Sequence, residues 1–295
     1  MTVDVVVVAY RSAAHLRECV EPLCDQPGLN VIVVDNACPE RSPALVADLD
    51  LEIVEMGANE GFSAGCNAGA GRGRGEAILF LNPDARIEPA AVRALAERLE
   101  HDPRCGACGP RVLDGDGHTS FTMRNDPRLG SAFAEALFVH HLLPHARRAN
   151  EIVRDGYDEP AEVEWLSGAA LCVRRTAFDR LGGFDRRFFM YSEDADLCLR
   201  LRNAGLTVRY DPAVVARHEG GASAPSPGQA ALKASSRLLY ARIHAGPLER
   251  PAFRVAAAVY EVVRLPLALA RSRAHLRGRL AALGAVLGRA PRRPA

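Results

Sequence analysis

The sequence lacks several features that would assign it to a class at once. No apolar run reaches the ~18 residues that a membrane-spanning helix needs, and the longest candidate, residues 255–270, contains Glu261, Arg264 and Pro266. The eight cysteines show neither a zinc-site spacing nor a disulfide framework, which favours free thiols in a reducing cytoplasm. No internal repeat is present. These absences argue against a bilayer-spanning protein, a small disulfide-rich fold and a repeat protein.

The first residues also lack the charged region and cleavage site of a secretory signal, so we expect a cytoplasmic protein. Charge is unevenly distributed along the chain. Ten arginines and one acid from Arg250 onward give this tail a charge of +9, and the net charge of +1 then leaves −8 for the rest. Such a tail predicts either a solvated end or a patch for an anionic lipid surface or nucleic acid.

The sequence does contain alternating strand-like and helix-like segments. Continuous β-branched or apolar runs at 3–10, 30–37, 51–56 and 77–85 are typical of strands buried on both faces of a parallel sheet. Helical patterns separate them, and a strong one follows at 88–100. This alternation predicts an α/β fold with a mostly parallel, doubly wound sheet.

Beyond residue 100 the pattern is less regular. We expect a helix around 131–143, a strand pair in 162–175, and a short strand, a turn and a loop in 206–223. The proline-rich segment 223–228 predicts a boundary, after which the chain is helical and basic.

Polar residues follow the predicted strands at Asp35, Asn59 and Asn82–Asp84. Ligands bind at the carboxyl ends of strands in such sheets, so these residues are expected at one edge. Each acid has a simpler interpretation as a turn residue, but Asp84 also offers the oxygen that a hard divalent cation favours. The glycines of residues 71–76 close a helix and precede a strand, which is the wrong order for a dinucleotide-binding loop.

Three acids begin the helix predicted after Ser192. Helical spacing puts Asp196 with Arg200 on a polar, solvated face, whereas Asp194 lies on the apolar face. The helix dipole accounts for acids in a first turn, yet it does not explain an inward Asp194. A carboxylate in such surroundings has a raised pKa and can accept a proton. Glu193 stays ambiguous between the two roles.

Seven segments occur in the order seen in family 2 glycosyltransferases of the GT-A fold: VVVVAY, VVDNA, NEGFSAGCN, LNPDA, WLSGAALCVRR, GGFDRRFFMYSEDADLCLRLRNAG and RHEGGAS. The chain most resembles the bacterial rhamnosyltransferase-like branch that builds cell-wall linkers and polysaccharides. The resemblance implies a GT-A domain at 1–225, with a nucleotide-binding half at about 1–110 and an acceptor half at about 110–225. A helical basic extension occupies 226–295.

The resemblance implies a role for each matching residue. Asp194 corresponds to the general base, Asp84 to the last acid of the D-x-D element that holds Mg²⁺ or Mn²⁺, and His218 to the metal-side histidine of some members. Asn82 replaces the first acid of that element, which leaves fewer acids on the metal. The residues implied to bind the nucleotide or donor are Tyr10, Asp35, Asn59, Gly61, Phe62, Gly65, Asn67, Asn82 and Asp84. Those implied to line the acceptor and donor pocket are Trp165, Gly168 and Glu193.

The implied reaction is a single displacement with inversion. Asp194 deprotonates an acceptor hydroxyl, which attacks the anomeric carbon while the metal neutralises the departing diphosphate. The donor expected first is dTDP-rhamnose, followed by UDP-galactofuranose or another UDP- or GDP-hexose. The acceptor is a hydroxyl of a cell-wall, lipid-linked or polysaccharide glycan, and no nucleic-acid partner is expected.

Two further interpretations follow from the same residues. Five tail arginines predict peripheral contact with the anionic inner face of the plasma membrane: Arg264, Arg271, Arg273, Arg277 and Arg279. The rival function is a non-catalytic nucleotide-sugar-binding protein of the same fold. The presence of both Asp84 and Asp194 disfavours that rival.

Overall fold

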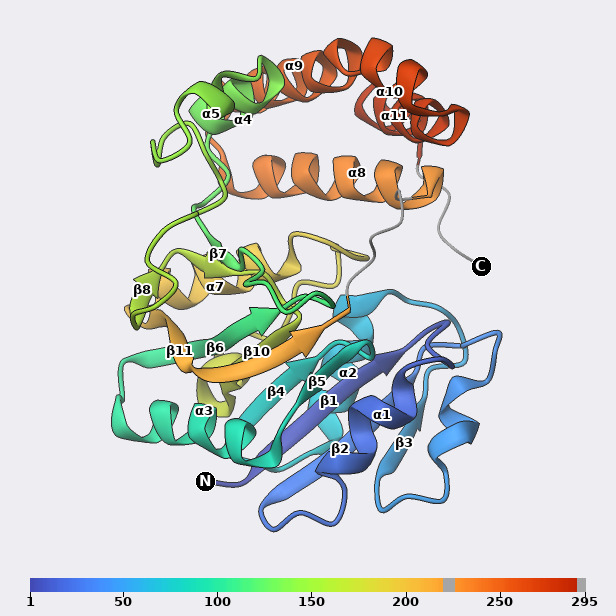
Figure 1. Ribbon diagram of the computed structural model, residues 1–295, viewed down its shortest axis with the longest axis vertical. Coiled ribbons are helices and arrows are strands. Elements are labelled where there is room, and N and C mark those ends of the chain that lie inside the picture. Colours follow the sequence, from blue (N-terminus) through green and yellow to red (C-terminus); the bar gives the residue numbers. More distant parts are fainter. Residues whose placement is uncertain (220–225, 291–295) are drawn as a thin grey trace. The chain divides into compact units, whose positions relative to one another are not determined.

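The structure is a computed structural model that describes residues 1–219 and 226–290 (Figure 1). Two compact units make up the chain. The sheet unit comprises Met1–Arg124, Gly156–Arg187 and Glu193–Gly220; the helical unit comprises Asn125–Asp155, Phe188–Ser192 and Gly221–Ala295. The expected boundary at 223–228 lies mostly outside the described residues, and the helical unit also takes in the expected acceptor-side segment 125–155.

The sheet unit contains all the strands. They are β1 (Val3–Ala9), β2 (Leu29–Asp35), β3 (Glu52–Glu55), β4 (Ala77–Leu81), β5 (Ala85–Ile87), β6 (Cys105–Leu113), β7 (Met123–Arg124), β8 (Ala161–Val163), β9 (Trp165–Leu166), β10 (Ala170–Arg174) and β11 (Thr207–His218). Its helices are α1 (Leu16–Val20), η1 (Glu21–Leu23), η2 (Ser42–Val46), α2 (Phe62–Arg72), α3 (Pro89–His101), α6 (Arg175–Arg180) and α7 (Glu193–Asn203). The helical unit holds α4 (Leu129–Ala136), α5 (Val139–Leu142), α8 (Pro227–His244), α9 (Glu249–Val263), α10 (Leu265–Arg271) and α11 (Arg273–Val286).

The main sheet has the order β3-β2-β1-β4-β10-β6-β11-β5, with β8 paired to β11. Strands β1 to β4 are mutually parallel, while β10 runs antiparallel to its neighbours β4 and β6. The sheet is therefore largely parallel, as the β-branched runs predict. The separate ladder of β7 and β9 is short but carries two residues of the site.

The alternation of side chains along β1 explains how the sheet is covered. Val5 and Val7 belong to the core formed with α1 and α3. Val6 and Val8 point to the other face, where Gly65 and Gly69 of α2 lie against them. A β carbon added at Gly69 would lie 2.4 Å from Val6 Cγ1, so α2 packs this closely only because it lacks side chains there.

The glycines of residues 71–76, which do not form a dinucleotide loop, wrap a buried acid. Asp4 is fully buried on β1 and pairs with Arg175 at 2.6 Å. The Gly75 N–H donates to the same carboxylate at 2.7 Å, and a β carbon at Gly73 would overlap it. Glycine is needed here because backbone approaches a charged group directly.

Three predicted segments differ from the structure. The strand expected at 77–85 ends at Leu81, because the Asn-Pro-Asp turn breaks it and starts β5. In the segment 206–223, residues Thr207–His218 form one long strand, β11, and the turn expected there is a register irregularity between Asp211 and Val215; the loop expected after it lies mostly outside the described residues. The helix expected at 131–143 is split into α4 and α5 by Phe138, whose φ of 62° ends helical geometry.

All eight cysteines lie in the described ranges, and each is a buried free thiol. Across those ranges no helix is both long and apolar enough to cross a bilayer.

Within the helical unit, α4 packs against α9 and α8 against α11 (Figure 1). Arg237 of α8 pairs with Glu135 and Glu151, which ties the segment 125–155 to the C-terminal helices. Two tail arginines expected at a membrane surface instead bind partners within this unit. Arg264 is buried, and Arg279 pairs with the buried Glu261.

Candidate active site

The carboxyl ends of β1 and β2 carry the first group of predicted donor-binding residues. Tyr10 follows β1 directly, and Asp35 ends β2 beside it, since Ala9 and Asp35 are partners in the ladder. Asp35 Oδ1 accepts a hydrogen bond from the Cys38 N–H at 2.8 Å, so it caps its turn as well. The guanidinium of Arg11 lies 5.6 Å from the Tyr10 ring centre. Parallel pairing therefore brings these residues to one edge.

Asn36, which follows Asp35, joins that edge to the loop before α2. Its amide donates to Asn59 Oδ1 at 3.0 Å and accepts from the Glu60 N–H at 3.0 Å. Asn59 also accepts from the Gly61 N–H at 3.2 Å. Gly61 has a φ of 93°, which glycine adopts readily, and it caps α2. The expected clustering of Asp35 and Asn59 is thus present in the structure.

Other residues predicted from the NEGFSAGCN segment have structural contacts. Phe62 packs near Phe184, with ring centres 6.4 Å apart. Asn67 uses both sides of its amide on the backbone of Phe184, at 2.8 and 2.9 Å. Gly65 lies against Val8, where an added β carbon would be 2.8 Å from Cγ1. These contacts anchor α2 and the Phe184 loop, and the donor contacts of these residues stay predictions.

A second group forms where β5 pairs with the end of β11. The ladder puts His218 opposite Ala85, so its ring lies beside Asp84. The distance from His218 Nε2 to Asp84 Oδ1 is 3.1 Å, and to Asn82 Nδ2 it is 3.4 Å. Burial acts to raise the pKa of Asp84, but the hydrogen bond and charge of His218 outweigh it and hold that pKa below its usual range.

The chemistry of this group fits a divalent cation. Asp84 supplies an ionised carboxylate and His218 a ring nitrogen next to it, both partly exposed. Such a pair leaves coordination positions for diphosphate oxygens and water. The Gly220–Ser223 part of the RHEGGAS segment lies outside the described residues.

Within the described part of the chain, one set of three side chains offers closely grouped ligand atoms, all within 4.8 Å: Asp114, Asp116 and His118. Asp114 Oδ1 accepts from the N–H groups of Asp116 and His118, so these contacts shape the turn. Asp114 and His218 also line a pocket of about 150 Å³. The turn after β6 therefore borders the Asp84–His218 group.

Asp194 belongs to a third group, at the start of α7. The Gly168 N–H donates to its Oδ2 at 3.0 Å, and the Ala195 N–H donates to its Oδ1 at 2.8 Å. Across the short ladder, Arg124 of β7 is the partner of Trp165 of β9. The Arg124 guanidinium lies 5.8 Å from the Trp165 ring centre.

The pKa of Asp194 is raised because the carboxylate is buried. Hydrogen bonds from Ala195 and Gly168, and then the charge of Arg124, partly offset that rise. Glu193 is 7% exposed, and burial followed by the charge of Asp194 raises its pKa well above the usual range. The pair thus combines an acid whose charged form is disfavoured with a carboxylate suited to accept a proton.

The structure contradicts the solvated position expected for Asp196, and it leaves Asp194, expected on the inward face, partly exposed. The Asp196 side chain is 1% exposed and pairs with Arg200 at 2.6 Å. These two residues share one face of α7, as their spacing of four predicts, but that face is turned inward. Phe188 and Phe189 are buried in the helical unit, where Ser236 donates to the Met190 carbonyl at 2.6 Å. The sheltering of Asp194 by these residues stays a prediction.

The turn before β10 links the second and third groups. The Ala169 carbonyl accepts from the Asn82 N–H at 3.0 Å, while the neighbouring Gly168 N–H holds Asp194. One short turn therefore carries contacts to both the predicted metal element and the predicted base.

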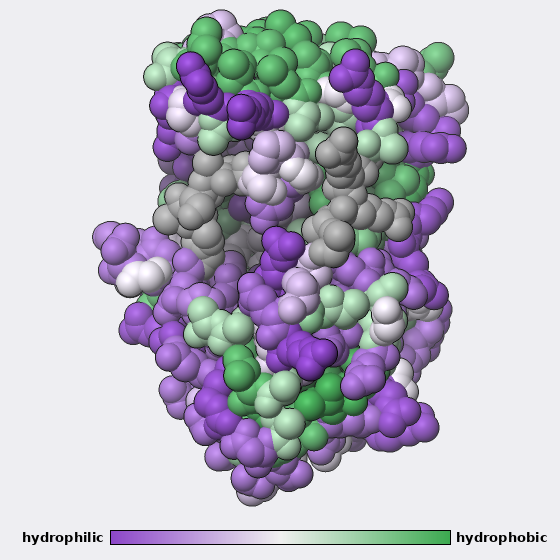
Figure 2. All heavy atoms as spheres, turned by 90° about the vertical axis from the view of Figure 1, so that its right-hand side faces the viewer, coloured by the Kyte–Doolittle hydropathy of each residue, from purple (hydrophilic) through white to green (hydrophobic). Residues whose placement is uncertain are grey.

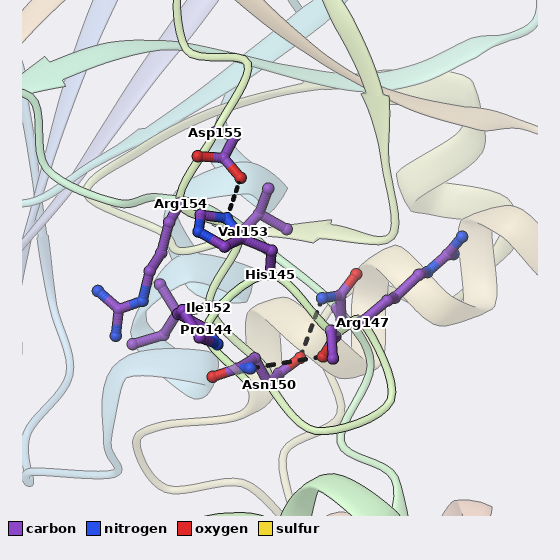
Figure 3. Close-up of a pocket in the computed structure, with 10 residues that line it drawn as sticks. Pro144, His145, Arg147, Asn150, Ile152, Val153, Arg154 and Asp155 are labelled. Atoms are coloured by element: carbon purple, nitrogen blue, oxygen red, sulfur yellow. Dashed lines mark hydrogen bonds and ion pairs between the residues drawn. The ribbon is translucent and has the colours of Figure 1, made fainter. Parts of the chain in front are cut away.

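A separate pocket lies in the helical unit (Figure 3). It has a volume of about 170 Å³, and a hydrogen bond between His145 and Asp155 crosses it. Ligand pockets for drug-sized molecules are roughly 300–1,000 Å³, so this one is small for a nucleotide sugar.

Two residues of the site were missed from the sequence. Asn36 had a signal, since it directly follows the polar tip Asp35. Arg124 had none, because a single arginine in an irregular segment shows no period or motif.

Comparison with known proteins places these observations in context. The family model described as Glycosyl transferase family 2 matches residues 4–158. An N-acetylglucosaminyl-diphospho-decaprenol L-rhamnosyltransferase of Mycobacterium tuberculosis (strain CDC 1551 / Oshkosh) is 32% identical over 264 residues, covering 82% of this chain and 85% of that protein.

Two solved structures show a similar fold. A Pyrobaculum calidifontis mannosyltransferase in complex with GDP-Man and Mn²⁺ has a TM-score of 0.56 at 18% identity, covering 97% of this chain and 86% of that one. GalNAc-T7 with UDP, GalNAc and Mn²⁺ has a TM-score of 0.62 at 12% identity. That match covers 88% of this chain but only about half of the other, 51%.

Proposed function

This chain belongs to glycosyl transferase family 2 and has a GT-A fold, and we propose that it is an inverting rhamnosyltransferase. The donor is dTDP-rhamnose and the acceptor a hydroxyl of a cell-wall, lipid-linked or polysaccharide glycan. One observation supports the catalytic part above others. Asp194 is a partly buried carboxylate of raised pKa, held by the Gly168 N–H in the same unit as the Asp84–His218 group.

The proposed reaction is one displacement. Asp194 takes the proton of the acceptor hydroxyl as that oxygen forms a bond to the anomeric carbon, and the bond from this carbon to the diphosphate breaks. Each Asp194 oxygen already accepts one backbone hydrogen bond, which orients the group and leaves a lone pair for the proton. A raised pKa makes the carboxylate a stronger base near neutral pH.

The residues at the strand ends bind the donor. Tyr10 and Asp35 lie where the nucleobase is expected, and Asn36 holds the Asn59 loop against that edge. Asp84 and His218 would hold a divalent cation, Mg²⁺ or Mn²⁺. When bound, that ion neutralises charge on the leaving diphosphate.

The replacement Asp194→Asn tests the base. We expect kcat to fall by roughly 10²–10⁴-fold, with donor affinity unchanged, because an amide has no proton-accepting carboxylate. The matched control is Asp179→Asn on α6, whose acid is exposed and pairs with Arg175 rather than with a residue of the site. Full transfer activity in Asp194→Asn would refute the base assignment.

A panel of nucleotide sugars tests the donor. Purified protein is assayed with dTDP-rhamnose, UDP-galactofuranose, UDP-hexoses and GDP-hexoses, with and without Mn²⁺, and the anomeric configuration of the product is read by NMR. We expect transfer from dTDP-rhamnose with inversion and with dependence on the ion. Binding of donors without transfer from any of them favours the non-catalytic alternative.

A further inference from the structure

Exposed large apolar side chains are concentrated in the helical unit. In the described part of the sheet unit they are Leu45, Phe121 and Val215. In the helical unit they are Leu137, Leu142, Leu143, Leu248, Val255, Val262, Val263, Leu267, Leu269, Leu280 and Leu287. Figure 2 shows this apolar surface in green at the top of the view, over the helical unit. Scattered apolar residues are ordinary on a surface, but a contiguous patch marks an interaction site.

The core of this patch lies on α9 and α10, which follow one another with only Arg264 between them. Val255 and Val262 lie seven residues apart on α9, so they share one side of that helix, and Leu269 is exposed on α10. Their exposed fractions are 54%, 49% and 64%. With the exposed Val263 and Leu267 they form what we call the α9–α10 face.

The two charged residues within this run are both turned inward. Arg264 donates to the carbonyls of Glu135 and Ala136, at 2.6 and 3.2 Å, and its guanidinium lies 3.8 Å from the Tyr260 ring centre. Glu261 is 5% exposed and accepts from Arg279 at 3.1 Å. The charges that interrupt the apolar run in the sequence therefore do not reach its outer face.

Positive charge lies at both ends of the face. Arg250 and Arg254 are exposed at its start, and Arg271, Arg273 and Arg277 are exposed just beyond its end. The only acid from residue 250 to 290 is the buried Glu261. An apolar face with arginines at its ends has the charge pattern of a helix that lies in the interface of an anionic bilayer.

We propose that the α9–α10 face docks on an anionic lipid bilayer, with its apolar side chains inserted at the headgroup level and the arginines on lipid phosphates. The sequence predicts a membrane contact through arginine charge alone, whereas this proposal adds the insertion of apolar side chains. Arg264 and Arg279 take no part in the contact, because they bind partners within the helical unit. A second copy fits less well. If two such faces met across a twofold axis, their arginine-bearing ends would come together and repel each other.

Vesicle co-sedimentation of the full chain gives the first test. Vesicles of phosphatidylglycerol with phosphatidylcholine are expected to pellet the protein at low salt, and part of this binding persists at high salt, where charge attraction is screened. No pelleting at low salt would overturn the proposal. Complete loss of vesicle binding at high salt would also overturn the proposal, because arginine charge alone would then explain the binding. The assay uses no donor sugar, so its outcome is independent of the proposed reaction.

Paired substitutions locate the contact. Val262→Asp with Leu269→Asp removes apolar area and adds negative charge, and we expect vesicle binding to weaken by tenfold or more at either salt concentration. Leu45→Asp is the matched control, since Leu45 is exposed in the sheet unit and its change should leave binding as it was. Far-ultraviolet circular dichroism checks that all variants are folded. Equal binding of the double variant and wild type contradicts the proposal.

Two further measurements separate the sources of binding. Arg271→Ser with Arg273→Ser should weaken binding to phosphatidylglycerol vesicles at low salt, by about fivefold per arginine, and leave the weaker binding to pure phosphatidylcholine unchanged. Sedimentation equilibrium without vesicles is expected to show the same mass for wild type and for the Val262, Leu269 double variant. A wild-type dimer that the double variant dissociates, with no vesicle binding, would instead assign the face to a second copy.

Discussion

At the scale of single residues, adjacent acids at the start of α7 differ because their surroundings differ. Glu193 Oε2 is buried without a hydrogen-bond partner, which disfavours the charged form of that acid. Asp194 is stabilised by two N–H groups and by the charge of Arg124, so it ionises more readily than its burial alone would allow. A charged Asp194 also makes ionisation of Glu193 harder. The two acids therefore disfavour being ionised at the same time.

Replacing Arg124 should shift the pH profile of the reaction. The base works when Asp194 is deprotonated, so activity is lost as pH falls through its raised pKa. Arg124→Met removes a charge that lowers this pKa, and the acidic limb of kcat/KM should move to higher pH. The measurement is the pH dependence of kcat/KM, with Arg72→Met on the exposed end of α2 as control. A limb that stays in place would show that Arg124 does not act on Asp194.

At the scale of elements, the distance between α2 and the sheet determines which glycines of the helix can be replaced by larger residues. On α2, Gly65 and Gly69 touch the sheet, while Gly71 has nothing within 4 Å of where its β carbon would lie. The helix anchors the Phe184 loop through Asn67, so its approach to β1 affects the position of the edge proposed to bind the donor.

Gly69→Ala and Gly71→Ala should change stability in opposite directions. The added methyl at Gly69 overlaps Val6 and Val34, and overpacking of this kind costs about 1–3 kcal/mol. At Gly71 the same change meets open space, and better helix propensity stabilises by up to about 1 kcal/mol. Urea unfolding measures both. Equal effects at the two positions would show that α2 does not lie this close to β1.

At the scale of the whole molecule, the chain forms two compact units, and ion pairs of Arg237 hold the helical one together. The helical unit is built from segments that are distant in sequence, and Arg237 joins them through Glu135 and Glu151. Burial acts to raise the pKa of Glu135, but Arg237 outweighs it and holds this pKa below the usual range. The pairing therefore contributes stability above the ordinary glutamate pKa and loses it as pH falls.

Arg237→Met should loosen the helical unit selectively. It leaves two acids without their partner and costs about 2 kcal/mol, a reduced figure because the arginine is 30% exposed. Hydrogen exchange should then speed up at α4 amides, by roughly 30-fold for that cost, while β1 and β4 amides keep their rates. The control is Arg242→Met, at an exposed position on the same helix. Unchanged exchange at α4 would mean that this ion pair does not hold the segment.

Much of the architecture was predictable because it depends on local patterns. The β-branched runs predicted β1, β2, β3 and β4, and the 3.6-residue period predicted α3. The same period failed for Asp196, because a residue classified as polar can still be buried when it has a partner such as Arg200. The end of β4 at Leu81 and the length of β11 depend on pairing with strands that are distant in the sequence. Local sequence patterns do not predict such pairing.

The sequence by itself determined the family, the largely parallel sheet and the edge at which Asp35 and Asn82 lie, since these follow from motifs and from periods within a few residues. Only the tertiary structure decided which side chains meet. His218 reaches Asp84 across 134 residues of chain, and Arg124 comes near Asp194 through the β7–β9 ladder. It also turned Glu261 and Arg264 inward and left an apolar face outside. Long-range packing makes these choices, because each depends on the free energy of contacts that no local segment contains.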